Sequence, residues 1–252
     1  MEIQGKKAVI VGGASGMAKA SAELLREKGA DIAILDLPNT AGAEVAKELG
    51  GTFHEVNILD EVQTETALAD AVDALGGLHI AVNTAGGGAA KRTLSKDGPH
   101  PLDTFRQTIE LNLIGTFNLN RLQAFHMSTN DPEDGERGVM IDTASIAAYE
   151  GQIGQVAYAA AKSGIVGMVF TMARDLGSLG IRAMAIAPSL FATGLTEGIP
   201  DEFAATLTKD AAFPKRLGRP EEYGKLAVAI VENPMLNGLC IRLDAGTRFA
   251  PK

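Results

Sequence analysis

Seven short apolar runs, with longer helical patterns between them, constrain the fold of this 252-residue chain more than any other feature. The runs do not alternate apolar with polar residues, which is typical of parallel strands buried on both faces of a sheet. Because helical patterns separate the runs, the sequence predicts an α/β fold: a doubly wound parallel sheet of about seven strands with helices on both faces. The predicted strands are Ala8–Val11, Asp31–Leu35, Phe53–Val56, His79–Asn83, Val139–Ala144, Arg182–Ala187 and Leu239–Leu243.

All 252 residues fit one domain, because this length can bury a sizeable core and no linker or repeat interrupts the pattern. Two polar stretches, Lys91–Pro101 and Ser128–Gly138, are predicted to leave the body of the fold at the surface. We expect the second to be a solvated loop. The first holds Lys91, Arg92 and Lys96, a local basic cluster in an acidic chain, which fits either a solvated loop or a contact with phosphate groups.

The charge of the chain and the spacing of its histidines argue against two kinds of site, a nucleic-acid site and a metal site. The formal net charge is −8 and the isoelectric point is near 5.1. We therefore expect no nucleic-acid binding, which requires clustered Lys and Arg. The four histidines show no spacing typical of metal ligands, so we predict no metal site.

The cysteine content and the terminus bear on the compartment. Cys240 is the only cysteine, so no disulfide can form within one chain, which favours a reducing environment. We expect a cytoplasmic protein, with the mitochondrial matrix as the alternative. We expect no leader segment, because the first predicted strand begins a few residues after Met1. We also expect no membrane span, because no apolar run approaches the required length.

Two predicted helices are apolar on more than one face. A helix that is apolar all round is buried in a core or against a partner chain. The two helices therefore predict a symmetric homo-oligomer. Their apolar residues are Phe105, Ile109, Leu113, Ile114, Phe117, Leu122 and Phe125 in the first, and Ile165, Val166, Met168, Val169, Phe170 and Met172 in the second.

A glycine-rich turn after the first predicted strand fits the pyrophosphate of a dinucleotide. Gly12 ends the strand in a tight turn, and Gly16 lets the backbone approach a pyrophosphate at the start of the next helix. Asp36 ends the second strand, where a carboxylate can bond both ribose hydroxyls. The pattern predicts a Rossmann-like site for NAD, because the 2′-phosphate of NADP would be repelled by Asp36 and no basic neighbour is at hand to offset that.

A Ser, a Tyr and a Lys have the spacing of a proton-transfer site. Tyr158 and Lys162 stand four residues apart, so they share one helix face, and Ser145 precedes the tyrosine. An unperturbed tyrosine has a pKa near 10. A positive charge about 4 Å away lowers that pKa by roughly three units at an effective dielectric near 20. We predict that Lys162 and the oxidised cofactor adjust Tyr158 to act as general base and acid, while Ser145 orients the substrate oxygen.

With these motifs the chain resembles the short-chain dehydrogenase/reductase family over nearly its whole length. The family's cofactor turn matches residues 11–18, with departures at Val11 and Ala18, and its Asn-Asn-Ala-Gly element matches Asn83–Gly86. Its Pro-Gly element matches Pro188-Ser189. The resemblance implies a catalytic set of Asn112, Ser145, Tyr158 and Lys162, in which Asn112 holds a water that links Lys162 to solvent.

The resemblance also implies binding residues for cofactor and substrate. The cofactor-binding residues would be Gly12, Ser15, Gly16, Met17, Asp36, Asn57, Ile58, Asn83, Ala85, Gly86, Tyr158, Lys162, Pro188, Leu190, Phe191 and Thr193. The substrate-binding residues would be Ser145, Gln152, Gln155, Tyr158, Leu195 and Phe203. The stretch Ile199–Phe213 would form a mobile lid over an apolar pocket.

Further segments are similar to one branch of that family, the type 2 3-hydroxyacyl-CoA dehydrogenases. They are Asp36–Asn39, Gly115–Asn118, Glu150–Gln152, Gly164–Met168 and Asn237–Gly238. This implies an NAD-dependent oxidoreductase of fatty acid metabolism that interconverts 3-hydroxyacyl-CoA and 3-oxoacyl-CoA as a homotetramer, with Lys91–Pro101 near coenzyme A. One alternative is a dehydrogenase of hydroxysteroids or other secondary alcohols. A second is a non-catalytic NAD(H)-sensing protein, against which the intact catalytic set argues.

Overall fold

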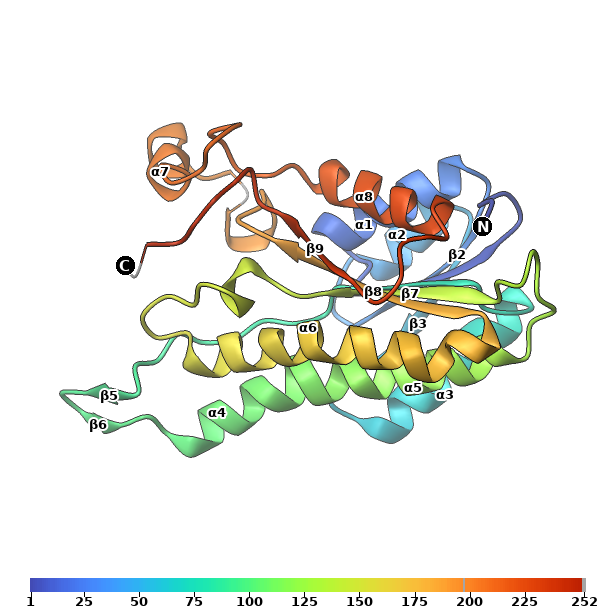
Figure 1. Cartoon of the computed structure of the whole chain (residues 1–252), viewed down its shortest axis with the longest axis horizontal. Coiled ribbons are helices and arrows are strands. Elements are labelled where there is room, and N and C mark those ends of the chain that lie inside the picture. Colours follow the sequence, from blue (N-terminus) through green and yellow to red (C-terminus); the bar gives the residue numbers. More distant parts are fainter. Residues whose placement is uncertain (197, 251–252) are drawn as a thin grey trace.

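A parallel sheet of seven strands lies at the centre of the protein (Figure 1). The computed structural model describes residues 1–196 and 198–250. The order across the sheet is β3-β2-β1-β4-β7-β8-β9, and every neighbouring pair is parallel. The strands are β1 (Lys7–Val11), β2 (Asp31–Asp36), β3 (Thr52–Glu55), β4 (Ile80–Asn83), β7 (Gly138–Thr143), β8 (Ile181–Pro188) and β9 (Cys240–Leu243). The doubly wound fold is confirmed, and each predicted strand end lies within one residue of the observed one.

Helices cover both faces of the sheet (Figure 1). On one face lie α1 (Gly16–Glu27), α2 (Gly42–Glu48) and α8 (Pro220–Glu232); on the other lie α3 (Glu61–Leu75), α5 (Gly115–Ser128) and α6 (Val156–Leu176). Successive strand residues point to opposite faces, so Ile10 joins the first core and Val9 the second. Both residues are fully buried, which explains why the strands read as continuous apolar runs.

A π-helical segment, Glu110–Ile114, joins α4 (Leu102–Ile109) to α5. The three pieces form one long rod alongside α6 (Figure 1). A π turn holds one extra residue, so it rotates the side chains of that turn relative to the helix on either side. Such turns are frequent at functional sites, and this one carries Asn112, which is fully buried.

The two polar stretches differ from each other. Lys91–Pro101 projects from the body and contains a short antiparallel hairpin of β5 (Leu94–Ser95) and β6 (Gly98–Pro99) (Figure 1). The stretch is therefore more ordered than a simple solvated loop. Ser128–Gly138 forms the expected loop after the end of α5, closed by an isolated bridge between Glu133 and Glu136.

Helix α6, with its continuation to Leu179, is long and apolar enough to cross a membrane by length and composition, with a mean hydropathy of 1.4. The prediction that no apolar run approaches that length is therefore wrong for this segment. Its inner side packs into the core beside β8 through Ile165 and Val169. A core helix of this kind passes the same test of length and composition.

Arg182 joins three parts of the chain at the start of β8. Its guanidinium pairs with Glu136, 2.7 Å away, and donates to the carbonyls of Ile230, Val231 and Leu236 near the end of α8. Glu136 also accepts from the N-terminal ammonium of Met1 at 3.0 Å. The arginine is buried and the glutamate side chain is only 11% exposed, so each depends largely on its partners for the hydrogen bonds that water would otherwise supply.

We predict that Arg182→Met destabilises the protein by about 3–5 kcal/mol, because it leaves a buried carboxylate and several carbonyls without their donor. Urea unfolding followed by circular dichroism measures the change. Arg106→Met is the matched control: Arg106 pairs with Asp103 on the surface, where such a pair contributes roughly 0–1 kcal/mol. Equal losses in the two variants would contradict the role given to Arg182.

Candidate active site

The turn after β1 is shaped by two glycines in left-handed backbone conformations. Gly12 has φ of 78°, and a Cβ there would lie 2.8 Å from Thr84 Oγ1 and 3.0 Å from the Ala85 nitrogen. Gly16 has φ of 55°, and a Cβ there would lie 2.9 Å from Thr193 Cγ2. Any larger residue would therefore push the turn away from the segments that follow β4 and β8.

Asp36 lies beside this turn at the end of β2. Its carboxylate accepts hydrogen bonds from the backbone nitrogen of Ala14 at 2.9 Å and from that of Leu37 at 2.7 Å. These two bonds aim the carboxylate along the edge of the turn. No basic side chain forms an ion pair with it in residues 1–196 and 198–250.

A cavity of about 460 Å³ opens above the turn. Ten of the sequence-predicted cofactor residues line it: Gly12, Ser15, Gly16, Met17, Asp36, Asn57, Ile58, Ala85, Gly86 and Thr193. Val11, Leu35, Leu37, Val56, Thr84, Leu111 and Gly194 complete the wall. Helix α1 begins at this cavity, and Ser15 at its N-cap makes no side-chain capping bond, so the first amides of the helix are left for an anion.

The side chains of Ser145 and Tyr158 lie within hydrogen-bonding reach of each other. Ser145 follows β7 and caps a short 3-10 turn, Ile146–Ala148, by accepting from the nitrogen of Ala147 at 3.1 Å. Tyr158 lies in the first turn of α6 and is half-buried. Burial raises the pKa of Tyr158, and a hydrogen bond with Ser145 acts in the opposite direction. The two hydroxyls are thus within reach of one substrate oxygen.

Lys162 and Asn112 lie behind the tyrosine. The ammonium of Lys162 is buried, donates to the carbonyl of Thr143 at 2.7 Å and lies 5.6 Å from the centre of the Tyr158 ring. Burial lowers the pKa of Lys162 to about 8. Asn112 accepts from the nitrogen of Gly87 at 3.0 Å and donates to the carbonyls of Gly87 and Thr108.

The catalytic set borders the cavity through Gly86. A Cβ at this residue would lie 2.7 Å from Asn112 Oδ1 and 3.3 Å from Lys162 Nζ, so glycine is required between them. Gly86 also lines the cavity. The structure therefore brings the four predicted catalytic residues together at the edge of the predicted cofactor site.

One expectation about this set needs correction. The predicted lowering of the Tyr158 pKa by Lys162 is not found in the protein without its cofactor, because burial dominates and raises that pKa. Lys162 lies beside the aromatic ring and is held by a backbone carbonyl. Asn112 binds the backbone of Gly87 through both ends of its amide and so positions the loop after β4, while its contact with a water stays a prediction.

Asn83 is not brought to the cavity. Its side chain is buried in a network in which its amide nitrogen donates to Asn120, Gln123 and Asp142, and its oxygen accepts from Gln123 at 2.8 Å. The residue was predicted to bind the cofactor because it belongs to the Asn-Asn-Ala-Gly element. Side chains along a strand point alternately to its two faces, and that of Asn83 in β4 points into the core. The next three residues, Thr84, Ala85 and Gly86, line the cavity.

The segment after β8 is placed only in part as expected. Thr193 lines the cavity, whereas Pro188, Leu190 and Phe191 do not. Phe191 is buried in the core and its ring packs against Gly218, where a Cβ would lie 2.7 Å from three ring atoms. Its ring therefore does not line this cavity, and its contact with the cofactor stays a prediction.

The predicted substrate residues are spread over two places. Gln152 and Gln155 line a second cavity of about 580 Å³ with Arg92, Thr93 and Leu94 of the projecting hairpin. Phe203 lies exposed on α7 (Asp201–Leu207), within the predicted lid. The side chain of Leu195 lies outside the described residues.

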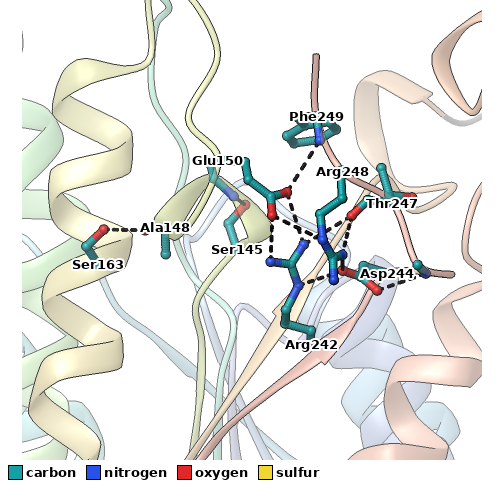
Figure 2. Close-up of polar contacts among 11 residues, drawn as sticks. Ser145, Ala148, Glu150, Ser163, Arg242, Asp244, Thr247, Arg248 and Phe249 are labelled. Atoms are coloured by element: carbon teal, nitrogen blue, oxygen red, sulfur yellow. Dashed lines mark hydrogen bonds and ion pairs between the residues drawn. The ribbon is translucent and has the colours of Figure 1, made fainter. Parts of the chain in front are cut away.

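A charged cluster that no sequence pattern predicted holds the far end of the Ser145 segment. Figure 2 shows Glu150, five residues after Ser145, facing Arg242 of β9 and the C-terminal stretch. Arg242 bonds both oxygens of Glu150 at 2.9 and 3.1 Å, and it also pairs with Asp244 at 2.7 Å. On the opposite side Ser163 of α6 donates to the carbonyl of Ala148. Glu150 and Arg242 are 92 residues apart in sequence, so no local pattern identifies this pair.

The sequence and the fold are similar to those of known proteins. A family model described as enoyl-(acyl carrier protein) reductase matches residues 12–248. The human 3-hydroxyacyl-CoA dehydrogenase type-2 is 48% identical, with 99% of this chain and 97% of the relative covered, and the Drosophila melanogaster protein of that name is 45% identical, with 99% and 100% covered. The crystal structure of 3-hydroxyacyl-CoA dehydrogenase type-2 from Mycobacterium avium has a TM-score of 0.94 at 42% identity, with 98% of both chains covered.

A second solved structure extends the comparison to another substrate. It is a 7 alpha-hydroxysteroid dehydrogenase in complex with NADH and 7-oxo glycochenodeoxycholic acid, with a TM-score of 0.87 at 28% identity over 100% of this chain and 97% of that one. The match to the family model and the full-length relatives agree with the glycine turn and the Ser-Tyr-Lys set. The chain belongs to the short-chain dehydrogenase/reductase family.

Proposed function

We propose that this protein is an NAD-dependent dehydrogenase that interconverts a 3-hydroxyacyl-CoA and a 3-oxoacyl-CoA. The proposal rests on one observation. The hydroxyls of Ser145 and Tyr158 lie close together beside the cavity that Asp36 also lines. One end of this site can move a proton at an alcohol oxygen, and the other can hold a dinucleotide. The names of the full-length relatives support the acyl-CoA substrate.

The residues that line the cavity above the glycine turn fit a dinucleotide. Gly12 and Gly16 leave room for backbone amides to approach a pyrophosphate, and the start of α1 offers its uncapped amides. Asp36 is aimed by two backbone bonds to accept from ribose hydroxyls. When bound, oxidised NAD supplies the hydride acceptor and a positive charge near the tyrosine.

The side chains of the protein carry out the proton transfer of the reaction. Tyr158 accepts the proton of the substrate hydroxyl as a phenolate, after losing its own proton to solvent. Because burial raises the pKa of Tyr158, the Lys162 ammonium and the positive charge of bound NAD would have to stabilise that phenolate. Ser145 holds the substrate oxygen in place by hydrogen bonding. Lys162 stands behind Tyr158 as a cation while the pH is below its pKa of about 8. In the reverse direction Tyr158 returns the proton to the ketone oxygen.

The residues that line the second cavity favour an acyl-CoA thioester over a smaller alcohol as the substrate. Arg92 lines the same cavity as Gln152 and Gln155, the two glutamines predicted to bind the substrate. A guanidinium is a good partner for the phosphates of coenzyme A. The likeness to a hydroxysteroid dehydrogenase keeps a steroid as the second candidate substrate. We also propose a place in fatty acid metabolism in the cytoplasm, with the mitochondrial matrix as the alternative.

Initial rates with NAD and a panel of 3-hydroxyacyl-CoA thioesters, hydroxysteroids and simple secondary alcohols test the substrate. We expect the thioesters to give the highest kcat/KM. We expect Tyr158→Phe to lower kcat by about 10²–10⁴-fold, because the general base is lost, while the binding of NADH followed by fluorescence stays nearly unchanged.

Tyr149→Phe is the matched control, because Tyr149 is a half-exposed tyrosine outside the catalytic set. It should retain most of the parent activity. A Tyr158→Phe variant within threefold of the parent rate would exclude Tyr158 as the base. A preference for steroids would leave the base in place and replace only the proposed substrate.

The position of Asp36 predicts a preference for NAD over NADP. A 2′-phosphate about 4 Å from this carboxylate is repelled by up to ~4 kcal/mol at an effective dielectric near 20. Screening reduces this, so we expect roughly a 10²-fold preference in kcat/KM. Asp36→Ala should weaken NAD binding and narrow the preference, and Leu37→Arg should narrow it further by supplying a phosphate partner.

The exposed Asp97 of the projecting hairpin serves as the control, since Asp97→Ala removes an equal charge far from the turn. It should leave the preference unchanged. Equal use of the two cofactors by the parent protein would mean that Asp36 does not face the ribose.

We propose a homotetramer that uses the outer faces of α5 and α6. Phe117 is 48% exposed, Phe125 67% and Phe170 51%, and these large apolar side chains stand on the two helices predicted to meet a partner chain. A pair of helices with such faces fits burial against a second copy. The proposed tetramer also follows the family resemblance.

Sedimentation at micromolar concentration tests the assembly. We expect a tetramer for the parent and smaller species for Phe125→Glu and Phe170→Glu, because each places a charge in the apolar contact. Val62→Glu on α3, where Val62 is 75% exposed, should not change the assembly. A parent protein that sediments only as a monomer would contradict the proposed tetramer.

A further inference from the structure

The reaction described above gives no role to Asp142, a buried carboxylate next to the catalytic set. Asp142 lies in β7, is only 1% exposed and stands directly before Thr143, whose carbonyl receives the Lys162 ammonium. Its carboxylate accepts from Asn83 at 2.9 Å and from Asn120 at 2.6 Å. Both donors are neutral amides, so they satisfy hydrogen bonds and leave the negative charge uncompensated.

Lys162 carries a positive charge that also has no direct counter-charge among the described residues. It is buried, and its one hydrogen bond is to a neutral backbone carbonyl. Within residues 1–196 and 198–250 no carboxylate lies within ion-pair distance of it. The low dielectric of the interior extends the reach of charge beyond direct contact. A buried anion and a buried cation on neighbouring elements therefore act on each other.

The other side chains around the two groups are neutral. Asn83 of β4, Asn120 and Gln123 of α5, and Asn112 of the π-helical segment carry no charge. Tyr158 on α6 and Tyr223 on α8 are the ionisable groups that remain, and burial raises the pKa of both phenols. Both phenols are therefore neutral near pH 7.

We propose that Asp142 is the buried counter-charge that keeps Lys162 an ammonium ion, and so a positioning residue for the proton transfer by Tyr158. The inference rests on the proposed function, because Asp142 acts on the reaction only through Lys162. The opposite charges support each other in the expected direction: Lys162 lowers the pKa of Asp142 and Asp142 raises the pKa of Lys162. Burial works against both, which brings the pKa of Asp142 to about 6 and that of Lys162 to about 8.

Between these two values both groups are charged, and this is the pH range in which the pair works. Asp142→Asn keeps the shape and removes the charge, so the pKa of Lys162 falls. The alkaline limb of kcat/KM for NAD, which reports groups of the free enzyme, should then move to lower pH by about one unit. At pH 8 that shift corresponds to a loss of roughly fivefold, with little change near pH 6.5.

A charge swap separates this electrostatic role from a structural one. Asp142→Asn combined with Asn120→Asp returns a carboxylate to the other end of the same hydrogen bond. We expect it to restore most of the alkaline pKa. A purely structural Asp142 would lower kcat at every pH without moving that pKa, and this result, or a swap that restores nothing, would overturn the proposal.

Unfolding measurements test the pair without any substrate. Because the pKa of Asp142 is raised in the folded state, the stability it contributes is present below its unfolded pKa and is lost as pH rises through about 6. Lys162→Met removes the counter-charge, so the loss of stability between pH 5 and 8 should become larger than in the parent. Adding Asp142→Asn should abolish that extra loss. Additive effects of the two changes would overturn the pairing even if the enzyme proves active, and coupled effects would uphold it even if the proposed substrate is wrong.

Discussion

The hydrogen bond from the Lys162 ammonium to the Thr143 carbonyl sets the geometry on which the rest of the site depends. It ties α6 to the end of β7 and so sets the register of the helix against the strand. Tyr158 stands one helical turn before Lys162, and Ser145 stands two residues after Thr143. With the bond in place, both hydroxyls lie at one edge of the sheet. Because the cation is buried, losing this acceptor would carry the desolvation cost of an unsatisfied charge.

The polar interior around this bond explains why several side chains that look like ligands serve the scaffold. Asn83, Asn120, Gln123 and Asp142 satisfy one another under β4 and β7, and Asn112 clamps the backbone of Gly87. The hydroxyl of Thr143 donates to the carbonyl of Asn83 and is joined by the phenol of Tyr223. A fully satisfied buried network specifies one arrangement of its elements, because any slip leaves a polar group without a partner.

Two charged clusters tie the ends of the described chain to the fold at opposite ends of the sheet. Glu136, in the loop before β7, binds both the N-terminal ammonium and Arg182, and Arg182 in turn donates to the end of α8. At the other end of the sheet Arg242 and Arg248 draw the C-terminal stretch onto Glu150, in the segment that begins with Ser145 (Figure 2). Such pairs are partly buried and multiply bonded, so they hold geometry better than exposed pairs do. The loop that carries Ser145 is therefore anchored on both sides.

Local patterns in the sequence determined the seven strands, the glycine turn, the place of Asp36 and the Ser-Tyr-Lys spacing. Each depends on neighbours within a turn, a strand or one helix face, where φ preference and side-chain period act directly. Only the tertiary structure decided that Asn83 and Phe191 turn into the core, that Glu150 meets Arg242, and that Asp142 shares the interior with Lys162. Those outcomes depend on which elements pack together and on how much water they exclude. Burial, which sets the pKa of Tyr158 and Lys162, belongs to the assembled fold and to no single segment of the chain.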